Sequence, residues 1–527
     1  MQPGNLQRLG RSLALPCAAF VCLIAAVLLA DPTERGLLWN TARLVGMVEL
    51  STLPLAAVVA FLLVRTNVVG RTVALVLCSS LLFVPLYLQL CGWEAAFGRQ
   101  GWHTFAFNTL DKPWLWGWQG VVFMHVVYSI PWATCLMAAA FSHGNRQHEE
   151  AALLDGNAWQ VFTQITLPQL TGGGLLAAVW ILVITAGEMT VTNIYLVPTY
   201  AEDVYNFYAG NADVQATVTH QMPLLLFVAA LVLLLLSVLR PAELLGEHEL
   251  YQWPMWRGRH VIGAGLLVLF LALTVFPLGN LVERLGMEVR QVDGQLVRGW
   301  SMLKGLQVLA DTPRKFAIEF RSTAAIATTA MLLAIVSAGT FAWLARRRPS
   351  VSALGWLITT LGIALPGPII GLGVIAILNH DQPLLIYLYD RTLVGPVLAI
   401  LVRVFPLAFI ALWWAFCTLD EEPLDAAALD GAGSWRQLFS IALPQRWPLL
   451  IGAALATFAI ASGDVSASLL VLPPGPRETI ARRMFGLIHV GADDQVAGVA
   501  LLCWLGYFVI AAIAIRLQRK QSLPTMS

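Results

Sequence analysis

The chain has 527 residues, of which 58% are hydrophobic and only 12% are charged, and its mean hydropathy is +0.72. Soluble globular chains carry about 25% charged residues, so the apolar share exceeds what a buried core needs and predicts lipid-facing surface. The formal net charge of +1 points to neither an acidic nor a basic partner and gives no sign of nucleic-acid binding. The seven cysteines include no C-x-x-C pair, which argues against a disulfide framework or a zinc site.

Twelve apolar stretches are long enough to cross a bilayer, whose hydrocarbon core of about 30 Å needs about 20 helical residues. The first resembles a signal peptide, but no A-x-A site precedes Asp31, so we interpret it as a retained span. The sequence therefore predicts an all-α membrane protein with two sets of six spans, near residues 12–30, 44–64, 71–91, 119–141, 172–190 and 222–239, then 260–280, 322–345, 354–378, 393–417, 448–471 and 495–515. In the ninth span, the Pro- and Gly-rich run 365–373 is a candidate break.

Basic residues in short connections predict the orientation of the spans, because they favour the cytoplasmic side. If the N-terminus lies on the cytoplasmic side, four basic groups lie on that side too: Arg65 with Arg71; Arg257 with Arg259; Arg346, Arg347 and Arg348; and Arg516, Arg519 and Lys520. Segment 477–483, with Arg477, Arg482 and Arg483, then falls outside and departs from the pattern.

The two sets of spans look like copies of one unit. An even number of spans per copy gives both the same orientation, which predicts a parallel repeat. Pro131 corresponds to Pro406, and the pair Gly187-Glu188 corresponds to Gly463-Asp464. We expect a first half at 1–240, a cytoplasmic linker at 241–259 and a second half at 260–527.

One motif occurs twice, each time between the fourth and fifth span of a half, at 150–168 and 425–444. Glu-Ala-Ala or Asp-Ala-Ala predicts the start of a short helix, with an acid near its positive end. A glycine then allows a turn, and Trp, Phe and Ile at helical spacing predict a second short helix. We expect the following Leu-Pro to end that helix. The result is a helix–turn–helix on the cytoplasmic side.

This pattern, E-A-A-x3-G-x9-I-x-L-P, resembles the signature of binding-protein-dependent ABC importer permeases. The resemblance implies that loops 146–170 and 420–446 each insert a coupling helix into an ATPase subunit. Two departures occur: Asp425 replaces Glu, and the first copy has eight residues rather than nine between Gly156 and Ile165. The ATPase-docking residues carried over by position are Glu150, Ala151, Ala152 and Gly156 in the first loop, and Asp425, Ala426, Ala427 and Gly431 in the second.

The resemblance also implies two ATP-binding cassette subunits, an extracytoplasmic substrate-binding protein, a multi-pass location in a prokaryotic inner membrane, and no cofactor. A fused chain with two loops is similar to the iron(III) and thiamine importers. Asp464, the Leu-rich run to Pro473 and the segment 479–483 resemble the iron(III) type. Iron(III) is therefore the expected substrate, with thiamine, polyamine or phosphonate as alternatives.

Glu188 and Asp464 lie late in the fifth and eleventh spans, where an acid is costly unless it faces a cavity or a partner. They either line the translocation path or reach the outer interface, and in an ion-coupled secondary transporter they would bind the ion. No Walker motif G-x-x-x-x-G-K-[ST] and no H-E-x-x-H motif occurs. We therefore expect a permease and not an enzyme, with no metal site and with ATP hydrolysis on a separate subunit.

Overall fold

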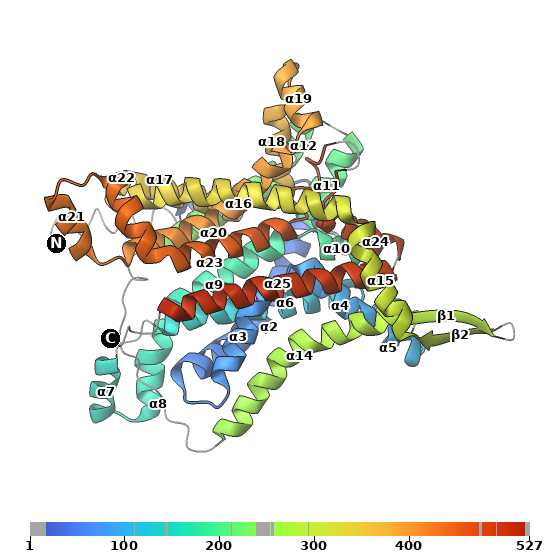
Figure 1. Cartoon of the computed structure of the whole chain (residues 1–527), viewed down its shortest axis with the longest axis horizontal. Coiled ribbons are helices and arrows are strands. Elements are labelled where there is room, and N and C mark those ends of the chain that lie inside the picture. Colours follow the sequence, from blue (N-terminus) through green and yellow to red (C-terminus); the bar gives the residue numbers. More distant parts are fainter. Residues whose placement is uncertain are drawn as a thin grey trace. The chain divides into compact units, whose positions relative to one another are not determined.

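The computed structural model describes residues 17–109, 111–142, 146–211, 213–238, 253, 258–292, 295–473, 477–491 and 493–521. Regular structure within these residues is almost entirely helical (Figure 1). The strands described form one antiparallel hairpin, in which Met287 of β1 (Met287–Val292) pairs with Trp300 of β2 (Gln295–Trp300). The prediction of an all-α membrane protein is confirmed.

Seven of the described helices are long and apolar enough to cross a membrane, or ten if each of three bent pairs forms one span. The seven are α2 (Pro32–Arg65), α6 (Gly117–Phe141), α14 (Arg259–Gly286), α16 (Ala317–Ala345), α20 (Val394–Cys417), the helix Ser434–Gly463, and Asp494–Leu517 within α25 (Asp493–Gln521). Two shorter apolar helices, Cys17–Leu29 and α13 (Met222–Val238), coincide with further predicted spans. The number twelve stays a prediction.

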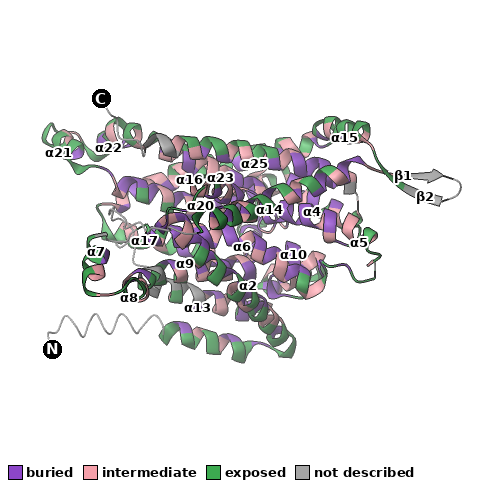
Figure 2. Cartoon of the chain, turned by 90° about the horizontal axis from the view of Figure 1, so that it is seen from below, coloured by how far each residue is buried: buried purple, intermediate pink, exposed green. Residues whose placement is uncertain are grey.

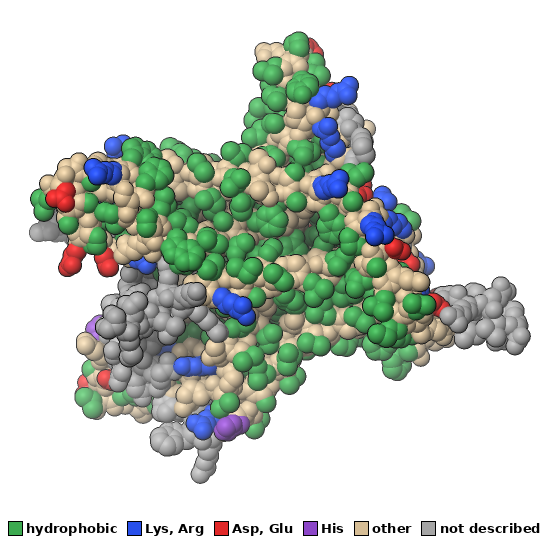
Figure 3. Space-filling model, in the orientation of Figure 1, with side chains coloured by type: hydrophobic (Ala, Val, Ile, Leu, Met, Phe, Trp, Pro, Cys, Tyr) green, Lys and Arg blue, Asp and Glu red, His purple; other side chains and the backbone are tan. Residues whose placement is uncertain are grey.

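Large apolar side chains are exposed along the long helices, as expected for surfaces that face lipid. Leu50 of α2 is 80% exposed, and Val261 of α14 and Val336 of α16 are also exposed. Hydrophobic side chains cover much of the face shown in Figure 3. A water-soluble protein rarely exposes so many large apolar side chains.

The helices pack into two compact units, one formed by Met1–Ala317 with Ile480–Leu505 and the other by Ile318–Thr479 with Gly506–Ser527. In the first unit α2 packs along α6 and α9 (Leu167–Ala186), while α14 packs against α3 (Arg71–Leu81) and α4 (Leu86–Phe97). The helix α14 belongs to this first packing unit, although it is the first helix of the predicted second half. The packing units therefore divide the chain differently from the predicted halves. The predicted halves 1–240 and 260–527 stay a prediction, and linker 241–259 lies mostly outside the described residues.

In the second unit, α20 packs against three helices: α17 (Pro349–Ala364), α18 (Gly367–Leu378) and α23 (Leu443–Gly463). Glycines allow the close approach between α17 and α20. A Cβ at Gly355 would lie 2.5 Å from the Phe409 ring, and one at Gly362 would lie 2.9 Å from the Pro406 ring. Small residues at helix contacts are how membrane helices gain dispersion energy without help from the hydrophobic effect.

A sharp break interrupts one predicted span in each unit. The predicted break in run 365–373 is present, because α17 and α18 meet at a bend of 112°. Leu365 is extended (ψ 124°) before Pro366, as sterics before proline demand. The first unit has a similar bend of 103° between α3 and the helix Leu86–Ala106, next to Pro85, which the sequence analysis did not predict.

The contact between α4 and α14 depends on Gly92, where an added Cβ would lie 2.5 Å from the Pro277 Cβ. We expect Gly92→Ala to force the helices apart, lowering the free energy of unfolding by about 1–3 kcal/mol, as overpacking usually does. The measurement is the midpoint temperature of unfolding in detergent, together with abundance in the membrane.

Gly265→Ala on α14 is the matched control, because nothing lies within 4 Å of its added Cβ. Alanine favours helix over glycine by about 1 kcal/mol, so this variant should be neutral or slightly more stable. Equal stability of the two variants would contradict the packing described for Gly92.

Candidate functional site: two docking loops

Each copy of the repeated motif folds into the same series of elements. The first docking loop (residues 146–170) contains α7 (Arg146–Asp155), α8 (Ala158–Val161) and the π-helical turn η1 (Phe162–Thr166), which leads into α9. The second docking loop (residues 420–446) contains α21 (Glu421–Leu429), α22 (Ser434–Gln437) and the π-helical turn η3 (Leu438–Ala442), which leads into α23. The predicted helix–turn–helix is therefore present twice.

The two turns are built differently, which accounts for the one-residue difference in length. In the second loop Gly431 has φ +81°, and the N–H of Ala432 donates to the Ala427 carbonyl at 2.8 Å, so the helix closes through a left-handed glycine. In the first loop Gly156 does not have a positive φ. There Asn157, the residue directly after Gly156, caps α8 in a reciprocal capping box with Gln160. The first loop can therefore lack one residue that the second has between its glycine and its second helix.

The expectation that Leu-Pro ends the second short helix is wrong for the second loop, where the helix continues, while in the first loop a bend lies at Leu167-Pro168. Pro168 and Pro444 lie in the first turns of α9 and α23, where a missing N–H costs little. The preceding π turns absorb the change in hydrogen-bond register. In the second loop the helix Ser434–Gly463 continues through the proline, and in the first a 55° bend separates Ala158–Thr166 from Thr171–Ala186.

Both loops present apolar side chains to solvent at equivalent positions. Leu154 and Leu429 are 88% and 90% exposed, and Trp159 and Trp435 are 71% and 50% exposed. Figure 2 shows exposed residues along α7, α8, α21 and α22. Exposed apolar groups outside the lipid-facing helices indicate an interaction surface. The sequence analysis missed Leu154 and Leu429, although aligning the two copies would have matched them.

The docking residues expected from the resemblance lie on these same helices. Glu150, Ala151, Asp425, Ala426 and Gly431 are exposed, whereas Ala152, Gly156 and Ala427 are half-buried. Their placement is compatible with contact to a partner, and their docking role stays a prediction.

Glu188 follows α9 in the first unit. Its carboxylate accepts hydrogen bonds from the backbone N–H groups of Thr190 (2.6 Å) and Val191 (2.9 Å), so it caps α10 (Thr190–Ile194). It also lies 3.7 Å from Nε2 of His125 on α6, and its side chain is 14% exposed. Glu188 therefore caps α10 and lies near α6 without a hydrogen bond to His125.

Asp464 has the equivalent environment in the second unit. It follows α23, accepts a hydrogen bond from the Ala467 N–H (2.9 Å), and lies 3.8 Å from Nε of Arg403 on α20. Its side chain is 7% exposed. Each acid thus lies near a side-chain nitrogen, of His125 or Arg403, on the helix that carries the matched proline, Pro131 or Pro406. The path role of these acids stays a prediction.

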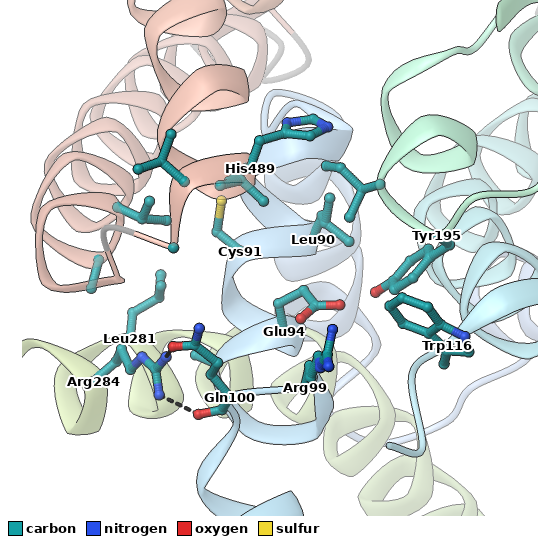
Figure 4. Close-up of a pocket in the computed structure, with 17 residues that line it drawn as sticks. Leu90, Cys91, Glu94, Arg99, Gln100, Trp116, Tyr195, Leu281, Arg284 and His489 are labelled. Atoms are coloured by element: carbon teal, nitrogen blue, oxygen red, sulfur yellow. Dashed lines mark hydrogen bonds between the residues drawn. The ribbon is translucent and has the colours of Figure 1, made fainter. Parts of the chain in front are cut away.

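A polar cavity of about 330 Å³ lies in the first unit, where α4, α10, the C-terminal part of α14 and α24 (Ile480–Val490) meet (Figure 4). Its lining includes Glu94, Arg99, Arg284 and His489. The Arg284 guanidinium donates to the backbone and side-chain oxygens of Gln100. The His489 ring bonds with the Phe485 carbonyl and the Asn193 side chain. Protein groups thus already engage much of the charge in this cavity.

The left-handed turn predicts a difference between the two loop glycines. Gly431→Ala should cost about 1 kcal/mol, because a Cβ disfavours positive φ, and should speed amide exchange in α21 about fivefold. Gly156→Ala should leave exchange in α7 nearly unchanged, since its Cβ would meet the flexible Gln160 side chain at 3.2 Å and the Ala152 carbonyl oxygen at 3.4 Å, an ordinary van der Waals distance. Hydrogen–deuterium exchange measures both, with Gly431→Asn as a milder control, and equal protection in α21 of Gly431→Ala and the unchanged chain would contradict the turn geometry.

No family model matches the chain. Part of it is similar to the thiamine transport system permease protein of Escherichia coli K12, with 31% identity over 125 residues, which is 23% of each chain. The molybdenum transport system permease protein of the same organism is 35% identical over 111 residues, 21% of this chain and 48% of the relative. Its counterpart from Haemophilus influenzae is 28% identical over 187 residues, 33% of this chain and 82% of the relative. The chain is thus similar, along part of its length, to transport system permease proteins.

Proposed function

We propose that the chain is the transmembrane permease subunit of an ATP-driven ABC importer in a prokaryotic inner membrane. The observation that carries this proposal is the docking loop itself, which is built twice with the same elements and exposes a leucine and a tryptophan at matched positions. A chain that receives two copies of one partner needs two such surfaces. The similarity to permease proteins of transport systems supports the same conclusion.

In this proposal each docking loop contacts one ATPase subunit through its exposed leucine and tryptophan and through the acid and alanines of the motif. Full burial of a large apolar side chain contributes about 1.5–3 kcal/mol. Burial of the leucine and the tryptophan of each loop would therefore stabilise the contact with the ATPase subunit. An extracytoplasmic binding protein delivers the substrate to the opposite side. The ATPases hydrolyse ATP, since this sequence contains no Walker motif.

Transport then requires that the permease has two states and that the ATPase dimer contacts them with different free energies. Closure of the dimer displaces the docking loops. Because α8 and α22 lead through π turns into α9 and α23, displacement of a loop moves a span directly. Alternating access follows from the rocking of the spans.

For the substrate, we propose iron(III) as the first candidate, on the resemblance of Asp464 to Pro473 and of segment 479–483 to iron(III) permeases. The similar proteins are named for thiamine, molybdenum and sulfate transport, so uptake assays should compare ferric iron, thiamine, molybdate and sulfate. Each candidate is supplied to a strain that lacks the importer for that compound and expresses this chain with its partners. Restored growth on one candidate would assign the substrate.

The test of the proposed function replaces both turn glycines, as Gly156→Arg with Gly431→Arg. We expect normal abundance in the membrane, loss of ATPase co-purification and loss of ATP-dependent uptake, because misplaced loops weaken docking without touching the lipid-buried spans. Gly210→Arg on the exposed part of α11 (Tyr200–Asn211) is the control, since nothing lies within 4 Å of that position.

Two outcomes would contradict the proposal. Wild-type uptake in the double variant would show that the loops do not couple transport to ATP. Uptake driven by an ion gradient in vesicles without ATP would instead favour an ion-coupled secondary transporter.

We further propose that Glu188 and Asp464 line the translocation path when it opens. In a cysteine-free background, Glu188→Cys and Asp464→Cys should react with a small water-soluble thiol reagent, and trapping nucleotide should change both rates. Leu50→Cys is the control, because this exposed apolar position on α2 should face lipid and stay unreactive. Inertness of both acid positions in every state would contradict the path role.

A further inference from the structure

A buried ion pair lies at the base of the first docking loop. The Arg65 guanidinium, at the C-terminal end of α2, pairs with the Glu149 carboxylate of α7, and both side chains are 0% exposed. Arg65 also donates to the Phe141 carbonyl at the end of α6 (3.4 Å). The Thr166 hydroxyl donates to the same Glu149 oxygen (2.9 Å) from the last residue of η1. Four elements are therefore joined at one carboxylate and one guanidinium.

Two further contacts surround this joint. The N–H of Trp253, the one described residue between 239 and 257, donates to the Arg65 carbonyl at 2.8 Å. The Trp253 ring packs edge-on against Phe162 of η1, and Phe61 of α2 packs edge-on against both Phe141 and Phe162. The aromatic rings exclude water, which strengthens the electrostatic attraction within the joint.

The second docking loop is held in a different way. At the position equivalent to Glu149 it has the fully buried Leu424, and at the position equivalent to Thr166 it has the buried Ala442. Its ion pair, between Arg346 after α16 and Glu421 of α21 (3.0 Å), lies one helical turn away; the Arg346 side chain is 5% exposed and the Glu421 side chain 58% exposed. The polar pair Glu149 and Thr166 is thus replaced by an apolar pair, and the charge contact involves a carboxylate that is exposed to water.

We infer that Arg65 and Glu149 are positioning residues that fix the first docking loop to α2, α6 and α9, so that ATPase movement reaches these spans through this joint. The inference rests on the proposed function. Removing one partner of a buried pair leaves an uncompensated charge, which costs far more than removing a partner of an exposed pair. In the second loop the Glu421 carboxylate is exposed to water although Arg346 is buried, so loss of Glu421 should cost less than loss of the fully buried Glu149.

The experiment uses the chain in complex with its ATPase subunits and binding protein, reconstituted in proteoliposomes. Glu149→Gln should leave membrane abundance and ATPase co-purification unchanged. We expect it to lower the number of substrate molecules transported per ATP hydrolysed about tenfold, within the range of allosteric coupling energies. Glu421→Gln is the matched control in the second loop, and we expect it to change that ratio less than about twofold, because water already screens the exposed Glu421 carboxylate.

A second variant separates coupling from folding. The combination Arg65→Met, Glu149→Leu and Thr166→Ala copies the apolar packing at Leu424 and Ala442, so the protein should fold and bind its ATPases. If the charged joint carries the coupling, this variant still transports little substrate per ATP. Recovery of the wild-type ratio would show a merely structural pair and overturn the inference, as would equal effects of Glu149→Gln and Glu421→Gln. Failure of the unchanged chain to bind an ATPase would refute the proposed function instead.

Discussion

Backbone hydrogen bonding in lipid is the constraint on which the rest of this structure depends. An unpaired N–H or C=O group in hydrocarbon costs several kcal/mol, so lipid-facing spans must be continuous helices. The breaks near Pro85 and Pro366 respect this rule, because the N–H of Leu88 bonds to the Pro85 carbonyl and that of Ile370 to the Pro366 carbonyl. Gly367 also approaches Ser466 so closely that a Cβ would lie 2.1 Å from its hydroxyl oxygen. The chain thus bends where protein, not lipid, surrounds it.

The docking loops escape the same constraint because they leave the apolar spans, and they can expose side chains that a partner would bury. The loops remain connected to the apolar helices α9 and α23. In the first loop a bend of 55° follows Thr166. In the second loop, where Pro444 lies in a first turn after a π turn, the short helix leads into α23 as one helix, Ser434–Gly463. A stiff connection of this kind transmits a displacement, whereas a loop ended at Leu-Pro would absorb it.

Features set by local rules could be predicted from the sequence. The apolar runs gave the membrane fold, and the glycine and acid-alanine pattern gave both helix–turn–helix loops, since left-handed glycines and helix ends depend on neighbouring residues. Tertiary features could not. Arg65 and Glu149 are 84 positions apart, and no periodicity marks them as partners. The packing of α14 against α4 also depends on distant residues, namely Gly92 and Pro277. The bend at Pro85 was missed because one proline beside an apolar run also suits an unbroken span.

The repeat makes the difference between the two joints interpretable. The two copies of the loop motif differ at one buried position, where the first has a carboxylate, Glu149, and the second has Leu424. A buried leucine needs only apolar neighbours such as Ala442, whereas a buried carboxylate needs a cation and further donors. In the first unit Arg65 and Thr166 both contact one oxygen of Glu149, and in the second the buried Arg346 pairs with the exposed carboxylate of Glu421. Two loops of one architecture are therefore attached to their spans by different contacts, and under the inferred role of the joint the first attachment is the stiffer one. A pair of identical ATPase subunits acting on them would meet an asymmetric load.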